Sequence, residues 1–392
     1  MWSSFGHWHI IIALCKIFHV NLIGLYVRQC KLLMEGGMLT MLKNLFSKRL
    51  FIVIAAISIT SLLTYLTFFS ALGLKLYDEK EKITFASQYS MKTAIVTEKG
   101  NVYINGEKDD ADAKALGIKN FKRFNNLYNS FRETAFVCIY DKGDASKVML
   151  SSQGGAIITK ENILYLFGSF ETKYLTPLKF ADNIKSAFPV NDRTYVLKTD
   201  GVFGYYLISN PNAFVTLFKS VVDFYVMEKS EEIIILTDSG ELFVAKYNEL
   251  NDFKLLINNV GGFSSIQFYK SATPSAVISI ITKDNELLGY ETFGNFSIEK
   301  ALSSTPRELG ENIRAAVPYN DGIAAINTNG DLVVYGKDFD LNNSYLSGEN
   351  IDKNCKMITS SAESVKVVMY DGSMKCYGYM NDQTHHSFKS HK

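Results

Sequence analysis

Histidine is almost absent from the body of this chain. The 392 residues include six histidines, and none of them lies between Val20 and Thr384. Serine-histidine-aspartate triads, cysteine-histidine pairs and histidine-ligated metal sites therefore cannot be assembled within that stretch. This excludes most classes of hydrolase. A polar tail explains His385, His386 and His391 as well as a metal site does, and we expect no metal.

Cysteine and tryptophan are scarce as well. Three of the five cysteines, Cys138, Cys355 and Cys376, lie in the C-terminal bulk, an odd number without C-x-x-C spacing. We expect isolated buried thiols and at most one disulfide, not a disulfide framework. Both tryptophans, Trp2 and Trp8, lie close to the N-terminus.

An excess of either charge is also missing. The 41 Lys and Arg residues balance 40 Asp and Glu residues, so no global field recruits nucleic acid, and we expect no nucleic-acid partner. No glycine-rich phosphate loop of the Walker or Rossmann form occurs, and no cofactor is expected. Tyrosine (22) and phenylalanine (27) are plentiful, and such flat side chains favour strands.

Residues 50–74 form an uncharged run, LFIVIAAISITSLLTYLTFFSALGL. About 20 apolar residues suffice to cross a bilayer, so we expect a single transmembrane helix here. Lys43, Lys48 and Arg49 precede the run. The bias of Lys and Arg between the two flanks of the run is small, and it indicates a cytoplasmic N-terminus and a C-terminal bulk outside the cell membrane. A cleaved signal peptide is the alternative, although its apolar region would exceed the usual length of about 7–15 residues.

The chain before this run divides into two parts. Residues 1–37 form an N-terminal extension, and the codons for Met34 to Met38 would resemble a bacterial ribosome-binding tract followed by a start. We therefore expect translation to begin at Met38 or Met41, with a weak membrane-associated helix in the extension as the alternative. Residues 38–49 are then a short cytoplasmic segment, and residues 75–82 are a linker.

One short pattern recurs seven times in the rest of the chain. An apolar run, often ending in threonine, is followed by two polar residues, a glycine or asparagine, and a second apolar run. The turn residues are Gly100, Asn162, Gly201, Gly240, Asn285, Gly330 and Gly372, with spacings of 62, 39, 39, 45, 45 and 42. Glycine and asparagine tolerate the positive φ of a tight turn, so each copy predicts a β-hairpin.

Each period also holds two further strand-like pieces. In one period the four predicted strands span residues 264–269, 276–282, 287–291 and 296–300. Four strands in about 40–50 residues are typical of a propeller blade, and no repeat has the apolar rhythm of paired helices. We therefore predict an all-β, seven-bladed β-propeller over residues 83–380, with a polar tail at 381–392.

The repeat resembles one known propeller family. The form A-x-x-T-x-x-G-x-φ-Y-x-x-G, clearest in blades one, two and six, is similar to the regulator-of-chromosome-condensation repeat, and this resemblance implies the same fold. The tryptophan of that repeat is replaced by Asn105, Phe167, Tyr335 or Tyr377, and its Gly-x-x-His element is missing. The family's nucleotide-exchange activity and nucleosome binding are therefore not expected. Degenerate bacterial relatives resemble adhesion, sensing or assembly modules.

The largest spacing contains an insertion at residues 107–133. It begins acidic, with Asp109, Asp110 and Asp112, which lack the spaced glycine and distal glutamate of a calcium loop. It then becomes basic and aromatic, and long loops on a rigid scaffold often carry binding. The candidate binding residues are Lys122, Arg123, Phe124, Tyr128, Phe131 and Arg132. An amphipathic helix packed against the side of the propeller is the alternative.

Together these features predict a function without catalysis. We expect a membrane-anchored propeller, outside the cell membrane, that binds or scaffolds a protein or a cell-surface glycan. Two alternatives stay open: a carbohydrate-active propeller enzyme with paired Asp and Glu side chains, and the sensor lobe of a membrane complex. Two convergent buried carboxylates in the central funnel would indicate the enzyme, whereas a polar funnel would indicate binding.

Overall fold

The structure is a computed structural model. It describes residues 77–78, 80–90, 92–105, 136–170, 173–270, 272–338, 345–379 and 385–386. Within these residues no helix has both the length and the apolar character needed to cross a membrane. The predicted membrane segment at 50–74 and the predicted insertion at 107–133, with its six candidate binding residues, lie outside the described residues.

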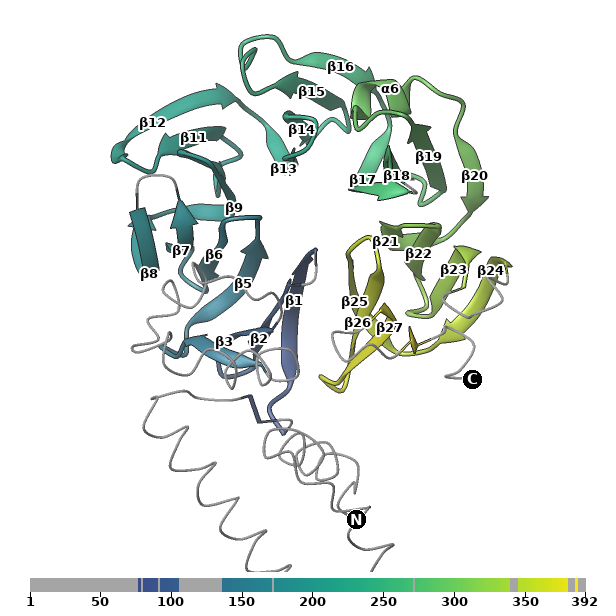
Figure 1. Cartoon of the computed structure of the whole chain (residues 1–392), viewed down its shortest axis with the longest axis horizontal. Helices are drawn as coiled ribbons and strands as arrows, with labels where there is room; N and C mark the ends of the chain where they lie inside the picture. Colours follow the sequence, from purple (N-terminus) through teal and green to yellow (C-terminus); the bar gives the residue numbers. More distant parts are fainter. Residues whose placement is uncertain are drawn as a thin grey trace, which may run out of the picture. The chain divides into compact units, whose positions relative to one another are not determined.

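Seven four-stranded antiparallel sheets stand around a common axis (Figure 1), which is the architecture of a seven-bladed β-propeller. The prediction of an all-β chain with seven blades is thus confirmed. Blade 1 contains β1 (Ile83–Tyr89), β2 (Lys92–Thr97), β3 (Val102–Asn105) and β4 (Val137–Tyr140). Blade 2 contains β5 (Ala145–Leu150), β6 (Gly154–Thr159), β7 (Leu164–Phe170) and β8 (Lys173–Ala181). Blade 3 contains β9 (Ile184–Val190), β10 (Arg193–Lys198), β11 (Phe203–Leu207) and β12 (Asn210–Phe218).

The remaining four blades repeat this order from the axis outwards. Blade 4 contains β13 (Val221–Met227), β14 (Glu232–Thr237), β15 (Leu242–Lys246) and β16 (Lys254–Ile257). Blade 5 contains β17 (Val260–Lys270), β18 (Thr273–Thr282), β19 (Leu287–Phe293), the helix α6 (Ile298–Leu302) and β20 (Arg307–Gly310). Blade 6 contains β21 (Ile313–Tyr319), β22 (Gly322–Asn327), β23 (Leu332–Lys337) and β24 (Tyr345–Asp352). Blade 7 contains β25 (Cys355–Ser360), β26 (Ser364–Met369), β27 (Met374–Tyr379) and β28 (His385–His386), the last within the segment predicted as a tail.

The seven predicted turn residues join the second and third strands of the blades. All seven adopt positive φ, between 62° and 88°, and each amide donates to the carbonyl three residues earlier at 2.8–3.1 Å. The threonine of the repeat completes the turn in several blades. Its hydroxyl accepts the backbone amide four residues later in blades 2, 4 and 5, at 3.0–3.1 Å from Thr159, Thr237 and Thr282.

The same turn residues also join neighbouring blades. The carbonyl of each one accepts a hydrogen bond, at 2.8–3.0 Å, from the first residue of the next innermost strand. Every innermost strand then carries an irregularity at its second residue, where its register against the next strand shifts. Because a bulge bends and twists a strand, this irregularity bends every innermost strand at the same position.

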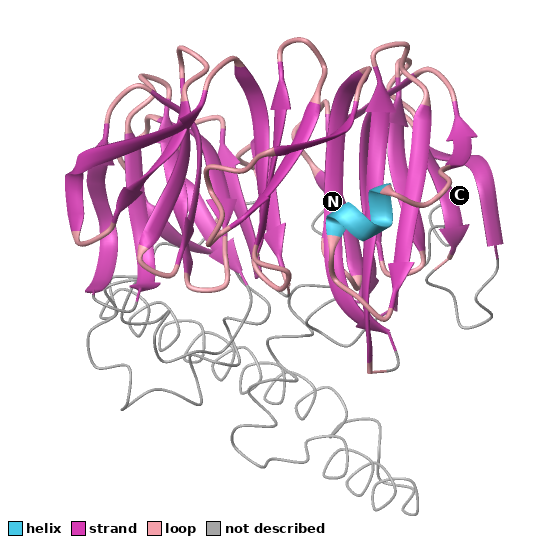
Figure 2. Cartoon of the chain, turned by 90° about the horizontal axis from the view of Figure 1, so that it is seen from above, coloured by secondary structure: helices cyan, strands magenta, loops and turns pink. Residues whose placement is uncertain are grey.

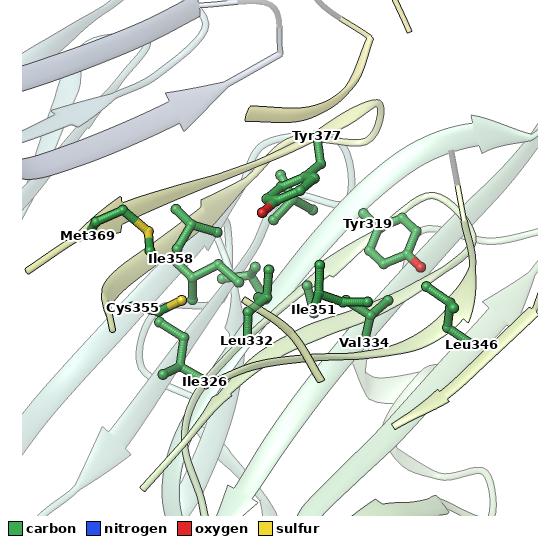
Figure 3. Packing of buried hydrophobic residues seen from close by; sticks show 14 residues of the cluster. Tyr319, Ile326, Leu332, Val334, Leu346, Ile351, Cys355, Ile358, Met369 and Tyr377 are labelled. Carbon is green, nitrogen blue, oxygen red and sulfur yellow. The ribbon is translucent and has the colours of Figure 1, made fainter. Parts of the chain in front are cut away.

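The hydrophobic core is divided among the junctions between blades. Seven clusters of buried side chains occur, one for each pair of neighbouring blades. Figure 3 shows the cluster between blades 6 and 7, where Tyr319, Leu346 and Ile351 of blade 6 and Ile358, Met369 and Tyr377 of blade 7 meet. The middle strands β2, β6 and β14 are buried over their whole length, which explains their unbroken apolar runs.

Blade 5 departs from the sequence prediction. Residues 296–300, predicted as its fourth strand, instead contain the cap and the first three residues of the helix α6 (Figure 2), and β20 is the outer strand. Ser297 caps the helix, accepting the amide of Lys300 at 3.4 Å. The carboxylate of Glu232 in blade 4 accepts the hydroxyl of Ser297 and the amide of Ile298, both at 2.7 Å. The prediction of a strand was wrong because a partner in another blade fixes these residues.

The cysteines of the propeller agree with the expectation of isolated thiols. Cys138, Cys355 and Cys376 are all free. Cys355 is buried in the cluster between blades 6 and 7, whereas the other two are half-buried. Burial raises the pKa of the Cys355 thiol to about 11, so this thiol stays protonated and unreactive at neutral pH.

Candidate functional site: the central cavity

The propeller encloses a cavity of about 580 Å³ on its axis. The lining residues come from the innermost strand of every blade and from the turns that follow these strands. A volume of this size falls within the range of about 300–1,000 Å³ that is usual for small-molecule sites. The cavity is therefore the candidate functional site, and its position follows from the ring of seven blades.

Hydroxyl and amide side chains supply most of the polar lining. The hydroxyl residues are Ser87, Ser90, Ser186, Ser264, Ser265, Thr359, Ser360 and Ser361, and the amides are Gln88, Gln267 and Asn320. Several of these side chains tie neighbouring blades together. Gln88 donates to the hydroxyl of Ser361 at 2.9 Å, and the side-chain oxygen of Gln267 accepts the amide of Lys229 at 3.0 Å.

Glu228 connects blades on opposite sides of the axis. Its carboxylate accepts the backbone amide of Ser152 in blade 2 at 3.1 Å and the hydroxyl of Tyr89 in blade 1. Lys92 of blade 1 donates to the carbonyl of Ser152 at 3.2 Å. Burial, and then the charge of Glu228, raise the pKa of Tyr89 well above its usual value. Tyr89 thus stays neutral and keeps donating to Glu228.

Tyr225 is the most exposed aromatic side chain of the lining, with 38% of its surface accessible. Phe224 and Phe268 line the same cavity but are buried. The blades around the channel partly shield Tyr225 from bulk water, and this burial, followed by the charge of Glu228, raises its pKa to about 12. Tyr225 therefore presents a neutral aromatic ring to the cavity at physiological pH.

The other end of the innermost strands carries a lysine in blades 2 and 3 and an aspartate, Asp223, in blade 4. Lys185 donates to the carbonyl of Val222 at 2.8 Å, and Lys147 to the carbonyl of Lys185 at 3.5 Å. Burial and the charge of Lys185 lower the pKa of Lys147. The pKa of Asp223 is raised, because the surrounding blades desolvate its carboxylate more than the Phe224 amide and the two lysines stabilise it. The two lysines thus join β5 to blade 3 and β9 to blade 4 through hydrogen bonds.

Among the described residues, two carboxylates line the cavity, and they differ in burial and in hydrogen bonding. Glu228 is half-buried and accepts hydrogen bonds from Ser152 and Tyr89, whereas Glu363 is exposed. A glycosidase needs two carboxyl groups that flank a sugar bond, one of them kept protonated. The described lining therefore does not present the buried pair that would have indicated the enzyme. The described residues also include no group of three or more His, Cys, Asp or Glu able to hold a metal.

The six binding residues predicted from the sequence are not among those that the structure describes, and it tests none of them. The described ends of their insertion are placed: β3 ends at Asn105, and Phe136 precedes β4. The amide of Tyr77 donates to the carbonyl of Phe136 at 3.0 Å, and the two rings lie 6.1 Å apart. Tyr77, shortly before the first strand of the propeller, therefore contacts Phe136, the residue just before β4.

Sequence reasoning missed the cavity residues. Glu228, Tyr225 and Gln267 lie in or just after innermost strands, which carry no part of the repeated turn pattern. In the same strand, β13, Tyr225 and Asp223 alternate with buried apolar residues, and the structure leaves both of them exposed.

Comparisons with known proteins give little beyond the fold. No family model matches the chain, and no curated protein matches its sequence. Among solved structures it is similar to PorZ, an essential bacterial surface component of the type-IX secretion system of Porphyromonas gingivalis, with a TM-score of 0.46 and 11% identity. The match covers 78% of this chain and 38% of the PorZ chain, so this chain spans well under half the length of that protein.

Two further similar structures are BamB from Moraxella catarrhalis and yeast RCC1 bound to Kap60. BamB matches with a TM-score of 0.43 and 12% identity, over 76% of this chain and 84% of that one. RCC1 matches with a TM-score of 0.40 and 16% identity, over 75% of this chain and 69% of that one. At these low values the similarities carry no argument about function or family, and the sheet order of the chain itself is what defines the propeller.

Proposed function

We propose that this protein is a membrane-anchored propeller that binds or scaffolds a protein or a glycan on the outer side of the cell membrane. Residues 50–74 serve as its single transmembrane helix, with the N-terminus in the cytoplasm. The propeller offers the ligand its central cavity and the loops around it. In this proposal the blades are degenerate repeats of the regulator-of-chromosome-condensation type, used as a scaffold without that family's exchange activity.

The observation that carries a binding function is the chemistry of the cavity. All seven blades contribute to its wall, and hydroxyl and amide groups outnumber charged ones there. The one half-buried carboxylate among the described wall residues, Glu228, already accepts hydrogen bonds from Tyr89 and Ser152. A site of this kind orients a ligand through hydrogen bonds and lacks an evident acid and base for turnover.

The insertion at 107–133 supplies the second contact surface in this proposal. Phe136, the first described residue after it, accepts a hydrogen bond from Tyr77, which lies shortly before the first strand of the propeller. The six candidate residues combine three cations with three aromatic rings. Aromatic residues and arginine are enriched among the side chains that dominate binding at protein interfaces.

Membrane anchoring and partner binding are tested on the full-length protein with a C-terminal epitope tag. We expect the protein in the membrane fraction and the tag open to a membrane-impermeant reagent on intact cells. We also expect partners cross-linked from outside to be lost when all six candidate residues are changed to serine. The matched control changes Asp109, Asp110 and Asp112 to serine and keeps the partners.

Two results would contradict this proposal. A soluble protein, or a tag that is reached only after the cells are opened, would contradict the anchor or its orientation. Identical cross-linked partners for the sixfold variant and the wild type would remove the insertion as a contact surface.

A further inference from the structure

The central cavity combines three properties that together select a class of ligand: its size, its uncommitted hydroxyls and its exposed aromatic ring. About 580 Å³ suits a compact molecule. A folded protein partner is too large to enter it, so the occupant is small whatever contacts are made elsewhere on the propeller.

Several polar groups of the wall have no partner within the described part of the chain. The hydroxyls of Ser87, Ser186 and Ser264, from blades 1, 3 and 5, line the cavity without a side-chain hydrogen bond. The side-chain oxygens of Gln88 and Asn320, also in the wall, have no donor either, but they are buried, so a ligand reaches them only when these side chains rotate. A hydroxyl both donates and accepts, and an amide oxygen accepts. A matching ligand therefore carries many neutral groups that donate and accept.

Two of the three charged side chains of the wall, Glu228 and Lys229, are already engaged, and the third, Glu363, is exposed. Glu228 accepts from Ser152 and Tyr89. Lys229 donates to the carbonyl of Gln267 at 3.2 Å and lies over the Phe296 ring at 5.3 Å, and burial lowers its pKa. A strongly anionic ligand would have to compete with these contacts for Lys229, and the two carboxylates of the wall would repel it. The wall thus favours a neutral ligand over an anionic one.

Tyr225 supplies the apolar surface that such a ligand also needs. Its ring is the most exposed aromatic group of the lining. The axial C–H groups of a pyranose form an apolar face that packs on an aromatic ring, while the hydroxyls around the sugar rim point to hydrogen-bonding groups. A peptide of the same volume would offer fewer hydroxyls and no such face.

We propose that the central cavity binds a neutral saccharide of one to three units, stacked on Tyr225 and hydrogen-bonded to the serine and amide groups of the inner strands. This inference deepens the proposed binding function and rests on it. The bridge from Glu228 to Tyr89 and Ser152 holds blades 1, 2 and 4 around the sugar. Glu228 is therefore a positioning residue of the wall.

The test uses isothermal titration calorimetry on the detergent-solubilised full-length chain. The probes are maltotriose, cellotriose, mannotriose and N,N′,N″-triacetylchitotriose, with sialyllactose as a charged sugar and a neutral serine-alanine hexapeptide as the rival class. We expect at least one neutral trisaccharide to bind with one site per chain. Tyr225→Ala should weaken that binding about tenfold or more, and Tyr225→Phe should keep it within about threefold because the ring remains.

Tyr370→Ala is the matched control, because Tyr370 is 63% exposed and is not part of the cavity wall. It should leave saccharide binding unchanged, and the thermal melts of all variants should establish that each is folded. The inference is overturned if no neutral trisaccharide binds, if only the hexapeptide or sialyllactose binds, or if Tyr225→Ala binds as the wild type does. In that event, cross-linked partners that still depend on the insertion would leave the broader binding function standing.

Discussion

At the scale of single residues, the glycine that closes the repeat pattern has a steric role. Gly336 ends the pattern in blade 6 and faces Gly322 across the sheet. Its φ is 140°, and a Cβ at this position would lie 2.3 Å from the carbonyl oxygen of Asp321. Only glycine allows this approach of two backbones without displacing one of them.

Gly336→Ala should therefore destabilise the propeller. We expect a loss of about 1–3 kcal/mol in the free energy of unfolding, because the new methyl group clashes with backbone that cannot rotate away. Urea unfolding followed by circular dichroism measures it. Gly262→Ala is the control, since a Cβ there meets nothing within 4 Å. Equal losses in the two variants would contradict the steric role of Gly336.

Tyr377 makes stability depend on alkaline pH. It is fully buried and donates to the carboxylate of Asp352; burial, and then Asp352, raise the pKa of its hydroxyl. A folded-state pKa above the unfolded value of about 10 means that the unfolded chain loses this proton first as pH rises. The contribution of Tyr377 is complete below about pH 10 and falls above it.

Stability measured by urea midpoints should thus fall from pH 9 to pH 11, and it should fall less steeply in Tyr377→Phe, which has no proton to lose. Tyr370→Phe, at an exposed tyrosine on the turn beside Gly372, serves as the comparison and should follow the wild type. Parallel pH curves for wild type and Tyr377→Phe would rule out this contribution.

At the scale of secondary-structure elements, blade 5 has the feature that departs most from the repeat. The five-residue helix α6 replaces an immediate connection between β19 and β20. An isolated helix of this length is not stable in water. Ile298, Ala301 and Leu302 bury one face of it in the cluster between blades 4 and 5, and Glu232 of blade 4 holds its first turn.

Glu232→Gln should loosen this element. The side chain of Glu232 is 2% exposed, and its carboxylate accepts from Ser230, Ser297 and the Ile298 amide. The NH2 group of glutamine would face one of these three donors, and that donor would lose its acceptor. We expect a loss of about 1.5–3 kcal/mol in unfolding free energy and faster hydrogen exchange at Ile298. The exposed Glu311→Gln should change neither quantity, and equal effects of both substitutions would argue against the buried contact.

At the scale of the whole molecule, the ring is closed without a shared sheet. Each blade uses four consecutive strands, so among the described strands none from one end of the chain completes the blade of the other. Blades 1 and 7 meet through the hydrogen bond from Ile83 to Gly372, through Gln88 and Ser361, and through a small apolar cluster. That cluster has five buried residues among those described, against nine to fourteen at the other junctions.

The closing junction should therefore open before the others. The six other junctions are held by the covalent chain as well as by their contacts, and the ends that separate at the seventh gain conformational entropy. Native-state hydrogen exchange should be faster at the Ile83 amide than at the Val221 amide, which makes the equivalent bond to Gly201. Equal exchange rates at these two amides would contradict a weaker seventh junction.

Much of this architecture was readable from the sequence, because its signals are local. The positive φ of Gly201 or Asn285 belongs to a turn formed by four or five adjacent residues. Counting such turns along the sequence gives the number of blades. The strand prediction failed at residues 296–300, where Phe and Ile suggested β structure but a carboxylate 66 residues away in sequence caps a helix. The predicted site at residues 122–132 stays a prediction.

The sequence by itself determined the all-β fold, the seven blades and the place of the seven repeated turns, since a hairpin depends on the φ angle and hydrogen bonds of adjacent residues. Only the tertiary structure decided the cavity. Its wall takes residues from all seven innermost strands and from the turns after them, and Glu228 meets Tyr89 and Ser152 only because closing the ring brings blades 1, 2 and 4 around one axis. Contacts of that kind depend on the positions of whole blades, and no window of sequence contains them.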